Sequence, residues 1–425
     1  MTLQHPLSPS PLTLPLREFR ISVGGLQPGM YVSRLDRPWL GTGFPLEGTL
    51  LRTVAEVEAI RAMCRHVFVD ASRGSSPELR FVEFDNPLMR QAGGQDEVDA
   101  LRRTYWNISR DFDSELGTAR DAHDRLQHDI EAVMSDVREG QRLNAEALTD
   151  GVDTMIDSIT RNPAALPWVL ELRRKGDYVY QHALGCAVWA ATFGRHLGLE
   201  RHDLRELAVG ALLCDVGKIR LQRTLLEDPQ PLSDGNFHLM RSHVSESCRI
   251  VRETEGLSPI VVDMVMHHHE RHDGSGYPRG LRGAAIPMTA RIAGLIDTFD
   301  AMTSVRPYAV SKSPHEAVME LYDSRDRLFQ AELVEQFIRT CGIYPTGSLV
   351  ELSDGTVGVV MAINSLKRLR PCVMLLLGTD KQPLSQFRSV DLSEVDTDAS
   401  GQPLTVTTSL PADAYGLDRS LLFLD

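Results

Sequence analysis

The chain has 425 residues, of which 42% are hydrophobic and 24% charged, and its formal net charge at pH 7 is −13. This acidity argues against a nucleic-acid-binding protein with a broad basic face, but leaves room for a small anionic ligand. No apolar run approaches the roughly 20 residues of a membrane span. The six cysteines lie far apart and form no Cys-x-x-Cys pair. We therefore expect a cytoplasmic protein of two or three domains without a disulfide framework.

The first part of the chain predicts a flexible tail at 1–16 and a small α/β domain at 17–85. Thr53 and Glu56 have the spacing of a capping box and predict the start of a short helix there. Segments on either side alternate as strands and are separated by glycine turns. The predicted strands are 20–23, 30–33 and 66–69. Because this region has no metal or nucleotide motif, we expect a regulatory or interaction role for it.

Residues 86–143 predict a linker followed by a long helix. Apolar residues recur at threes and fours between Asp96 and Glu139, which indicates an amphipathic helix. The stripe has two interpretations: a seam between two copies of the chain, or a face packed on its own domain. Gly117 weakens the first, since glycine is a poor helix former.

Residues 144–343 have helical periodicity almost throughout, and residues 344–425 change to strand patterns. Ser353-Asp354-Gly355 supplies the turn of a hairpin between the first two of these strands. The predicted strands are 349–352, 357–361 and 373–377. We therefore predict a mainly α protein with a small N-terminal α/β domain and a short C-terminal β appendage.

Metal-ligating residue types are distributed over several of the predicted helices. Imidazole and carboxylate ligands in one domain are typical of a metal-dependent hydrolase, and this mixture suits iron, manganese or zinc. Cysteine occupies a place where another histidine would be expected. The candidate ligands are His182, Cys214, Asp215, His243, His268, His269 and Asp297.

The ordered motifs between 177 and 308 resemble the HD-GYP family, a branch of the HD phosphohydrolases. They include Cys214-Asp215-Val216-Gly217-Lys218, His268-His269-Glu270, the loop Asp273-Gly-Ser-Gly-Tyr-Pro278 and Arg306-Pro307-Tyr308. The resemblance implies an HD-type helical bundle over 144–343 that hydrolyses cyclic di-GMP to pGpG, and in some members on to GMP. In relatives, a domain like 17–85 often precedes the bundle, and the 273–278 loop is linked to contacts with diguanylate cyclase domains.

The resemblance also implies roles for single residues. Asp215 would bridge two divalent metal ions. His182 and Asp297 would complete the ligands of one ion, and His243, His268 and His269 those of the other. Lys218 would reach the scissile phosphate, so Asp215 and Lys218 are the catalytic candidates. Arg306 would hold the other phosphate, with Lys312 replacing the basic residue that is missing at Ala309. Tyr178 stands where some relatives carry a glutamate, so we expect no third metal.

Because Cys214 stands where the family has a ligand histidine, two functions of the domain remain open. As a thiolate it can bind metal, but as a small buried hydrophobe it leaves one metal short of a ligand. The first function is an active phosphodiesterase. The alternative is a degenerate domain that acts as a nucleotide receptor or a protein-interaction scaffold. A hydrolase for other nucleotides is disfavoured by the Gly-Tyr-Pro loop.

Overall fold

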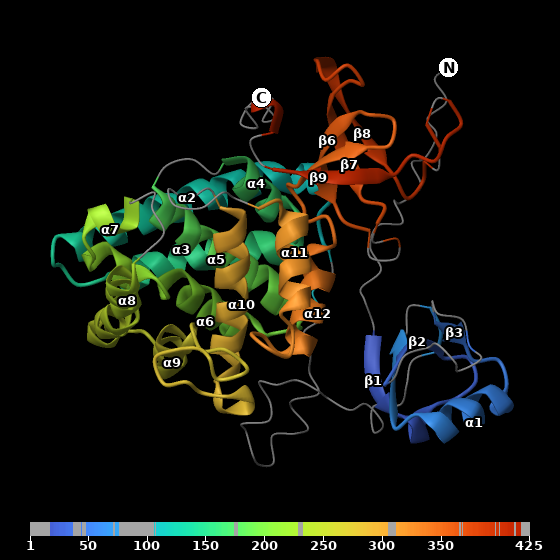
Figure 1. Ribbon diagram of the computed structural model, residues 1–425, viewed down its shortest axis with the longest axis horizontal. Coiled ribbons are helices and arrows are strands. Elements are labelled where there is room, and N and C mark those ends of the chain that lie inside the picture. Colours follow the sequence, from blue (N-terminus) through green and yellow to red (C-terminus); the bar gives the residue numbers. More distant parts are fainter. Residues whose placement is uncertain are drawn as a thin grey trace. The chain divides into compact units, whose positions relative to one another are not determined.

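The structure is a computed structural model (Figure 1), and it separates into two compact units, residues 1–107 and 108–425. The residues that it describes are 18–36, 44, 48–70, 73–75, 106, 108–173, 177–227, 233–304, 312–364, 367, 369–395, 397–398, 400–411 and 414–417. No helix among these residues is long and apolar enough to cross a membrane. All six cysteines are free thiols, as expected from their spacing.

The first unit is a four-stranded antiparallel sheet with one helix. Its elements are β1 (Glu18–Ser22), β2 (Tyr31–Leu35), β3 (Thr49–Leu50), α1 (Val54–Met63) and β4 (His66–Asp70), with strand order β1-β4-β2-β3. Thr53 and Glu56 form the predicted capping box at the start of α1. Val57 and Ile60 on α1 pack with Val67 and Val69 of β4 in one apolar core. The α/β prediction for this region is confirmed.

The second unit is mostly helical. Its helices are α2 (Phe112–Arg138), α3 (Ala145–Arg161), α4 (Ala165–Arg173), α5 (Tyr178–His196), α6 (Arg201–Leu213), α7 (Arg223–Glu227), α8 (Asp234–Glu253), α9 (Pro259–His267), α10 (Met288–Thr303), α11 (Pro314–Asp323) and α12 (Ala331–Cys341). Helix α5 runs through the middle and packs on α6 and α10. Trp189 of α5 contacts Phe299 of α10 and Phe337 of α12 edge to face. This aromatic core fixes the helices that carry the candidate ligands.

Helix α2 starts later than predicted, and its packing bears on the two interpretations of its apolar stripe. Residues 108–111 are not helical, and Asp111 caps a helix that begins at Phe112. The part of the prediction over 96–105 and 107 lies outside the described residues. Its apolar stripe, which includes Leu126, Ile130 and Val133, is buried. Because α2 packs on α3, α4 and α5, the described part of the stripe packs within its own domain, which favours the second interpretation.

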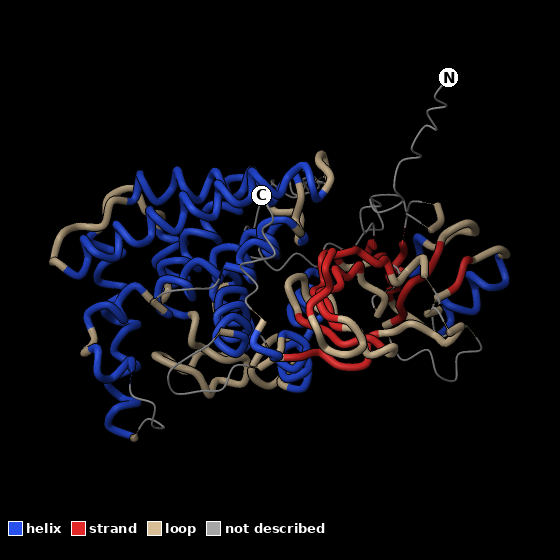
Figure 2. The backbone as a smooth tube through the Cα atoms, turned by 90° about the horizontal axis from the view of Figure 1, so that it is seen from above, coloured by secondary structure: helices blue, strands red, loops and turns tan. Residues whose placement is uncertain are grey.

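The end of the chain forms a five-stranded antiparallel sheet (Figure 2). Its strands are β5 (Leu349–Leu352), β6 (Val357–Ala362), β7 (Cys372–Leu377), β8 (Pro383–Asp391) and β9 (Val406–Leu410), in the order β8-β7-β6-β5-β9. Val350, Val360 and Val373 lie in its core. The predicted strands are present, and β8 and β9, which had no prediction, extend the sheet on both edges. The fold class, mainly α with small sheets at both ends, is confirmed.

Candidate metal centre

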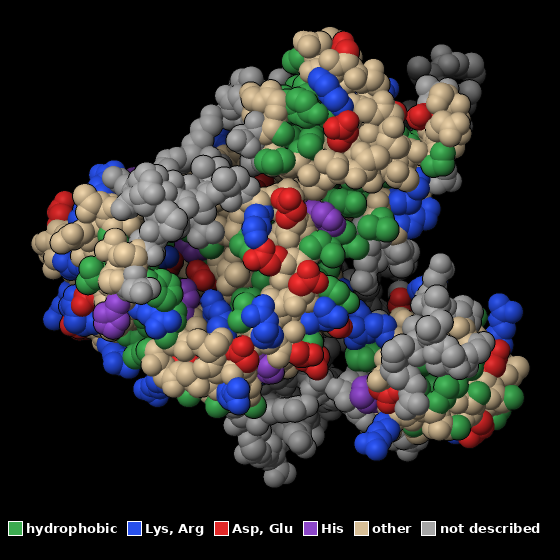
Figure 3. Space-filling view, viewed as in Figure 1, with side chains coloured by type: hydrophobic (Ala, Val, Ile, Leu, Met, Phe, Trp, Pro, Cys, Tyr) green, Lys and Arg blue, Asp and Glu red, His purple; other side chains and the backbone are tan. Residues whose placement is uncertain are grey.

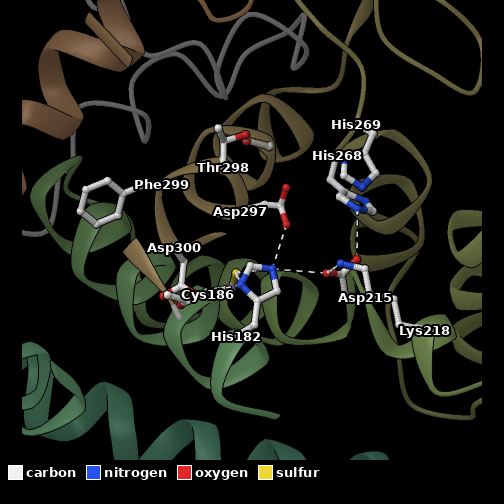
Figure 4. A network of polar contacts seen from close by, with 12 residues as sticks. His182, Cys186, Asp215, Lys218, His268, His269, Asp297, Thr298, Phe299 and Asp300 are labelled. Carbon is white, nitrogen blue, oxygen red and sulfur yellow. Dashed lines mark hydrogen bonds and ion pairs between the residues drawn. The ribbon is translucent and has the colours of Figure 1, made fainter. Parts of the chain in front are cut away.

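Five elements of the helical unit bring the candidate ligands to one place (Figure 4). His182 lies in the first half of α5, and Asp215 follows the end of α6. His243 lies on α8, while Asp297 lies on α10. His268 and His269 follow the last residue of α9. Residues separated by more than one hundred positions thus meet through the packing of α5, α6, α8, α9 and α10.

Asp215 lies between two sets of ligand atoms. Its Oδ1 is 3.1 Å from Nε2 of His243 and 3.8 Å from Nε2 of His268. Its Oδ2 is 3.3 Å from Nε2 of His182, and that nitrogen is 3.0 Å from Oδ1 of Asp297. Figure 4 shows His182 and the α9 histidines on two sides of Asp215.

The ligand atoms form two groups around this carboxylate. One group contains Asp215, His243, His268 and His269, the other His182, Asp215 and Asp297, and in each the atoms lie within 4.8 Å of one another. We call them the four-ligand and three-ligand subsites. Nitrogen and oxygen donors in such groups match the needs of a divalent transition metal.

Two buried atoms of the centre form no hydrogen bond of acceptable geometry within the described part of the chain, although His243 Nε2 lies 3.1 Å from one of them. They are Oδ1 of Asp215 and Nε2 of His268. Buried polar atoms are almost always satisfied, because leaving one unpaired costs about 1–3 kcal/mol. A metal ion on the four-ligand subsite would satisfy both atoms. The residues present therefore fit a metal.

Burial and neighbouring charges set the protonation of these ligands. Burial lowers the pKa of His268 to about 4 and also lowers that of His269. Burial alone would raise the pKa of Asp215, but Lys218 and the nearby histidines outweigh it and hold that pKa well below its usual range. The pKa of Asp297 is lowered in the same way by its hydrogen bond to His182, against the effect of burial. Neutral imidazoles and ionised carboxylates are the forms that bind metal.

His182 is oriented by a carboxylate behind it. Its Nδ1–H donates to Oδ2 of Asp300 over 2.7 Å, which turns Nε2 toward Asp215 and Asp297. A carboxylate on the far nitrogen fixes the tautomer and raises the basicity of a ligand histidine. A Cβ at Gly185 would lie 2.1 Å from Oδ1 of Asp300, so only glycine admits this carboxylate. Asp300 was not among the predicted site residues, although its spacing of three from Asp297 on one helix signalled a shared face.

The turn after α6 is held close to α8. A Cβ at Gly217 would lie 2.3 Å from the carbonyl oxygen of His243, and the Gly217 N–H donates to Ser247 Oγ over 2.8 Å. This contact presents Asp215 to His243. In the same turn the ammonium group of Lys218 pairs with Oδ2 of Asp215. Burial opposes the charge of Lys218, but Asp215 outweighs it and raises the pKa of that lysine.

Two cysteines lie near the three-ligand subsite. Cys214 is buried, and no group of ligand atoms within the described residues includes it. Burial raises the pKa of its thiol, which disfavours the thiolate that binds metal. Cys186 groups with His182 and Asp300, but its sulfur is 3.8 Å from both ring nitrogens. The Cys186 sulfur does not belong to the group that His182 forms with Asp215 and Asp297.

Aromatic rings cover both subsites. The Tyr178 ring stacks on His182, with centroids 5.4 Å apart, and the Tyr277 ring stacks on His269, with centroids 4.7 Å apart. Glu270 accepts hydrogen bonds from the backbone N–H groups of Arg279 and Leu281 and so holds the 273–280 loop in place. Tyr277, the aromatic residue of the 273–278 loop, therefore lies directly against a candidate ligand.

Three further residues remain: His267, which precedes the tandem histidines, and the predicted phosphate ligands Lys312 and Arg306. His267 stays outside the ligand groups, and its Nδ1 is hydrogen-bonded to the carbonyl oxygen of Asp263. Lys312 pairs with Glu320 and carries no contact to the ligands among the described residues. Arg306 falls outside the described residues.

Three families match parts of the chain. Residues 164–333 match the HD domain, residues 18–148 a domain of unknown function (DUF3391), and residues 349–397 a KOW domain associated with the HD domain. The first of these matches contains every candidate ligand of both subsites.

Curated relatives match over different lengths. The chain is 31% identical over 402 residues to "Cyclic di-GMP phosphodiesterase PA4108" of Pseudomonas aeruginosa, covering 93% of each chain. It is 34% identical over 344 residues to "Cyclic di-GMP phosphodiesterase response regulator RpfG" of Xanthomonas campestris, covering 68% of this chain and 88% of that one. A shorter match, 34% over 144 residues, covers 34% of this chain and 33% of "3'3'-cGAMP-specific phosphodiesterase 1" of Vibrio cholerae. The chain therefore belongs to the HD-GYP family of HD-domain proteins.

Proposed function

We propose that this protein is a metal-dependent phosphodiesterase that opens cyclic di-GMP to linear pGpG, with GMP as a further product to be tested. The observation that carries the proposal is the position of Asp215 between the two subsites. A carboxylate shared in this way can bridge two metal ions, as hydrolysis of a phosphodiester favours. Relatives named cyclic di-GMP phosphodiesterases that match over most of the chain support the substrate class.

Two divalent ions, from iron, manganese or zinc, are the proposed cofactors. His243, His268 and His269 would hold one, His182 and Asp297 the other, with Asp215 common to both. When bound, such ions neutralise charge on phosphate and lower the pKa of a water. Hydrolysis of the phosphodiester adds a water molecule to phosphorus and breaks one P–O bond to the sugar. The released sugar oxygen takes up a proton.

The chain's own groups prepare this reaction. Asp300 holds the His182 ring, and Tyr178 and Tyr277 cover the two histidine sets and limit access of bulk water. Lys218, which pairs with Asp215, carries its positive charge beside the centre, where it can meet an oxygen of the scissile phosphate. Arg306 remains a proposed ligand of the other phosphate.

Other roles follow from the family and remain proposals. Residues 17–85 would regulate the catalytic domain at 144–343 across the linker and helix at 86–143, and residues 344–425 would be an appendage. The 273–278 loop would contact diguanylate cyclase domains. A homodimer is kept as a proposal, without α2 as its seam.

The decisive experiment measures metal content and turnover on the same freshly purified protein. We expect bound transition metal and conversion of cyclic di-GMP to pGpG after addition of Mn²⁺ or Fe²⁺, followed by chromatography of the products. 3'3'-cGAMP is tested in parallel. His202→Gln on the exposed surface of α6 is the control, because it removes a histidine outside the centre. Metal-free protein that binds cyclic di-GMP without turnover would support a receptor instead.

A further inference from the structure

Arg241 of α8 lies against two aromatic rings. Its guanidinium carbon is 4.4 Å from the centre of the Tyr277 ring and 4.6 Å from that of Phe237. Phe237 is one helical turn before Arg241 and is 46% exposed, although it is a large apolar side chain. Figure 3 shows hydrophobic, basic and histidine side chains together on the surface over α7 and α8. Two rings restrict a side chain that would otherwise sample many rotamers.

This guanidinium lies at the rim of the four-ligand subsite. Arg241 precedes His243 by two residues on α8, and the Tyr277 ring that it contacts stacks on His269. Nε2 of His269 is in turn 3.1 Å from Nε2 of His243. The Tyr277 ring thus lies between the guanidinium of Arg241 and the candidate ligand His269. At this position Arg241 can contact a substrate bound at the centre but is not itself a metal ligand.

Within the described part of the chain, the charge of Arg241 is unpaired, in contrast to that of other cations discussed above. Lys218 pairs with Asp215, and Lys312 pairs with Glu320. Arg241 forms no ion pair or hydrogen bond with a residue in the described ranges. An exposed arginine on the same helix, Arg249, pairs with both Glu246 and Glu253. A cation held in place by rings and left without a carboxylate is suited to an incoming anion.

We propose that Arg241 binds the phosphate of the cyclic dinucleotide that is not being cleaved. The inference rests on the proposed function and adds a residue to its substrate site. The planar fork of arginine matches two phosphate oxygens, and stacking on Tyr277 and Phe237 keeps that fork oriented. Lys218 lies at the centre, where the scissile phosphate would be, so the rim cation serves the second phosphate.

A purely structural explanation exists and makes a different prediction. The contact of Arg241 with Tyr277 also joins α8 to the 273–280 loop, and its loss could simply loosen that loop. In that case Arg241→Ala would lower the melting temperature and the turnover of any phosphodiester alike. A role in binding the second phosphate affects only substrates that have one.

The test compares two substrates on the metal-loaded full chain. Cyclic di-GMP has two phosphates, whereas bis(p-nitrophenyl) phosphate has a single phosphodiester. For Arg241→Ala we expect KM for cyclic di-GMP to rise about tenfold to a hundredfold, because the variant loses a charge-assisted hydrogen bond to the phosphate. Its hydrolysis of bis(p-nitrophenyl) phosphate should match wild type. Arg241→Lys keeps the charge but not the planar fork, so its KM for cyclic di-GMP should lie between those of wild type and Arg241→Ala. Arg249→Ala is the matched control.

The outcomes separate this inference from the function on which it rests. Equal KM values for wild type and Arg241→Ala overturn the role of Arg241 while the phosphodiesterase stands. An equal loss on both substrates with a lower melting temperature assigns Arg241 to loop packing and also overturns it. If neither substrate is cleaved, calorimetric binding of cyclic di-GMP decides: weaker binding by Arg241→Ala supports the inference although the proposed function fails. Binding by neither protein overturns both.

Discussion

The two subsites share Asp215 but differ in how they are built. The four-ligand subsite has three histidines, of which His268 and His269 follow one helix directly. The three-ligand subsite has His182 and Asp297, and Cys214 stands nearby without joining it. A metal held by fewer protein ligands is held less tightly and keeps more open positions. If the proposed two ions bind, we expect the ion at the four-ligand subsite to be held more tightly and the ion at the three-ligand subsite to exchange more readily.

The largest effect should come from the residue that the subsites share. Asp215→Asn keeps the size of the side chain but removes the charge that would bridge two ions. We expect loss of metal from both subsites and turnover below detection, measured by elemental analysis and product chromatography. Asp203→Asn on the exposed face of α6 is the control. Metal content like that of wild type in Asp215→Asn would mean that the subsites do not depend on a common carboxylate.

Acid should empty the subsites in sequence. Burial opposes protonation of His182, but its electrostatic contacts with neighbouring groups, Asp215 and Asp297 among them, outweigh burial and raise its pKa well above the usual value. A metal must therefore displace a proton from His182, and its apparent affinity falls as the pH falls through the neutral range. His268, with its pKa lowered to about 4, competes with protons only in stronger acid. Metal content followed from pH 8 to pH 4 should fall in two steps. A single step would mean that the two subsites do not differ in their sensitivity to acid.

The carboxylate behind His182 should affect one subsite alone. Asp300→Asn weakens the hold on the Nδ1 side of the ring while leaving every candidate ligand in place. Such partners of ligand histidines are worth about tenfold to a hundredfold in metal affinity. We expect that loss for the weaker ion only, measured by competition with a chelator. Equal weakening of both ions would show that the subsites act as one unit.

The smallest expected effect tests Cys214. Cys214→His places a nitrogen ligand of greater reach beside the three-ligand subsite, so metal content or activity should rise by several-fold at most. Cys214→Ser is the control for loss of the thiol. In the cobalt-substituted wild type, sulfur-to-metal charge-transfer absorption should be absent, since the Cys214 sulfur lies outside both ligand groups. A clear sulfur band, or a fall in both quantities in Cys214→His, would make Cys214 an adapted ligand.

Some features could be read from the sequence because they depend on local chemistry. The Thr53–Glu56 capping box, the Ser353-Asp354-Gly355 turn and the helical periodicity all involve neighbours within a few residues. The tandem His268-His269 and the order of the motifs were enough to name the candidate ligands. Helix α2 shows the limit of this reading, because periodicity identified a stripe but gave neither its first residue nor its partner.

Only the tertiary structure decided how distant residues meet. Sequence spacing could not show that Asp300 lies behind His182, which is 118 positions away, or that Gly185 makes room for it. It could not place Cys214 beside rather than within the ligand groups, nor bring Arg241 to the Tyr277 ring over His269. Side-chain type is a property of the chain, but distance and orientation arise when α5, α8, α9 and α10 pack around a common core. The sequence therefore determined which metal-ligating and charged side chains are present, and the packing of the helices decided which of their atoms lie close together.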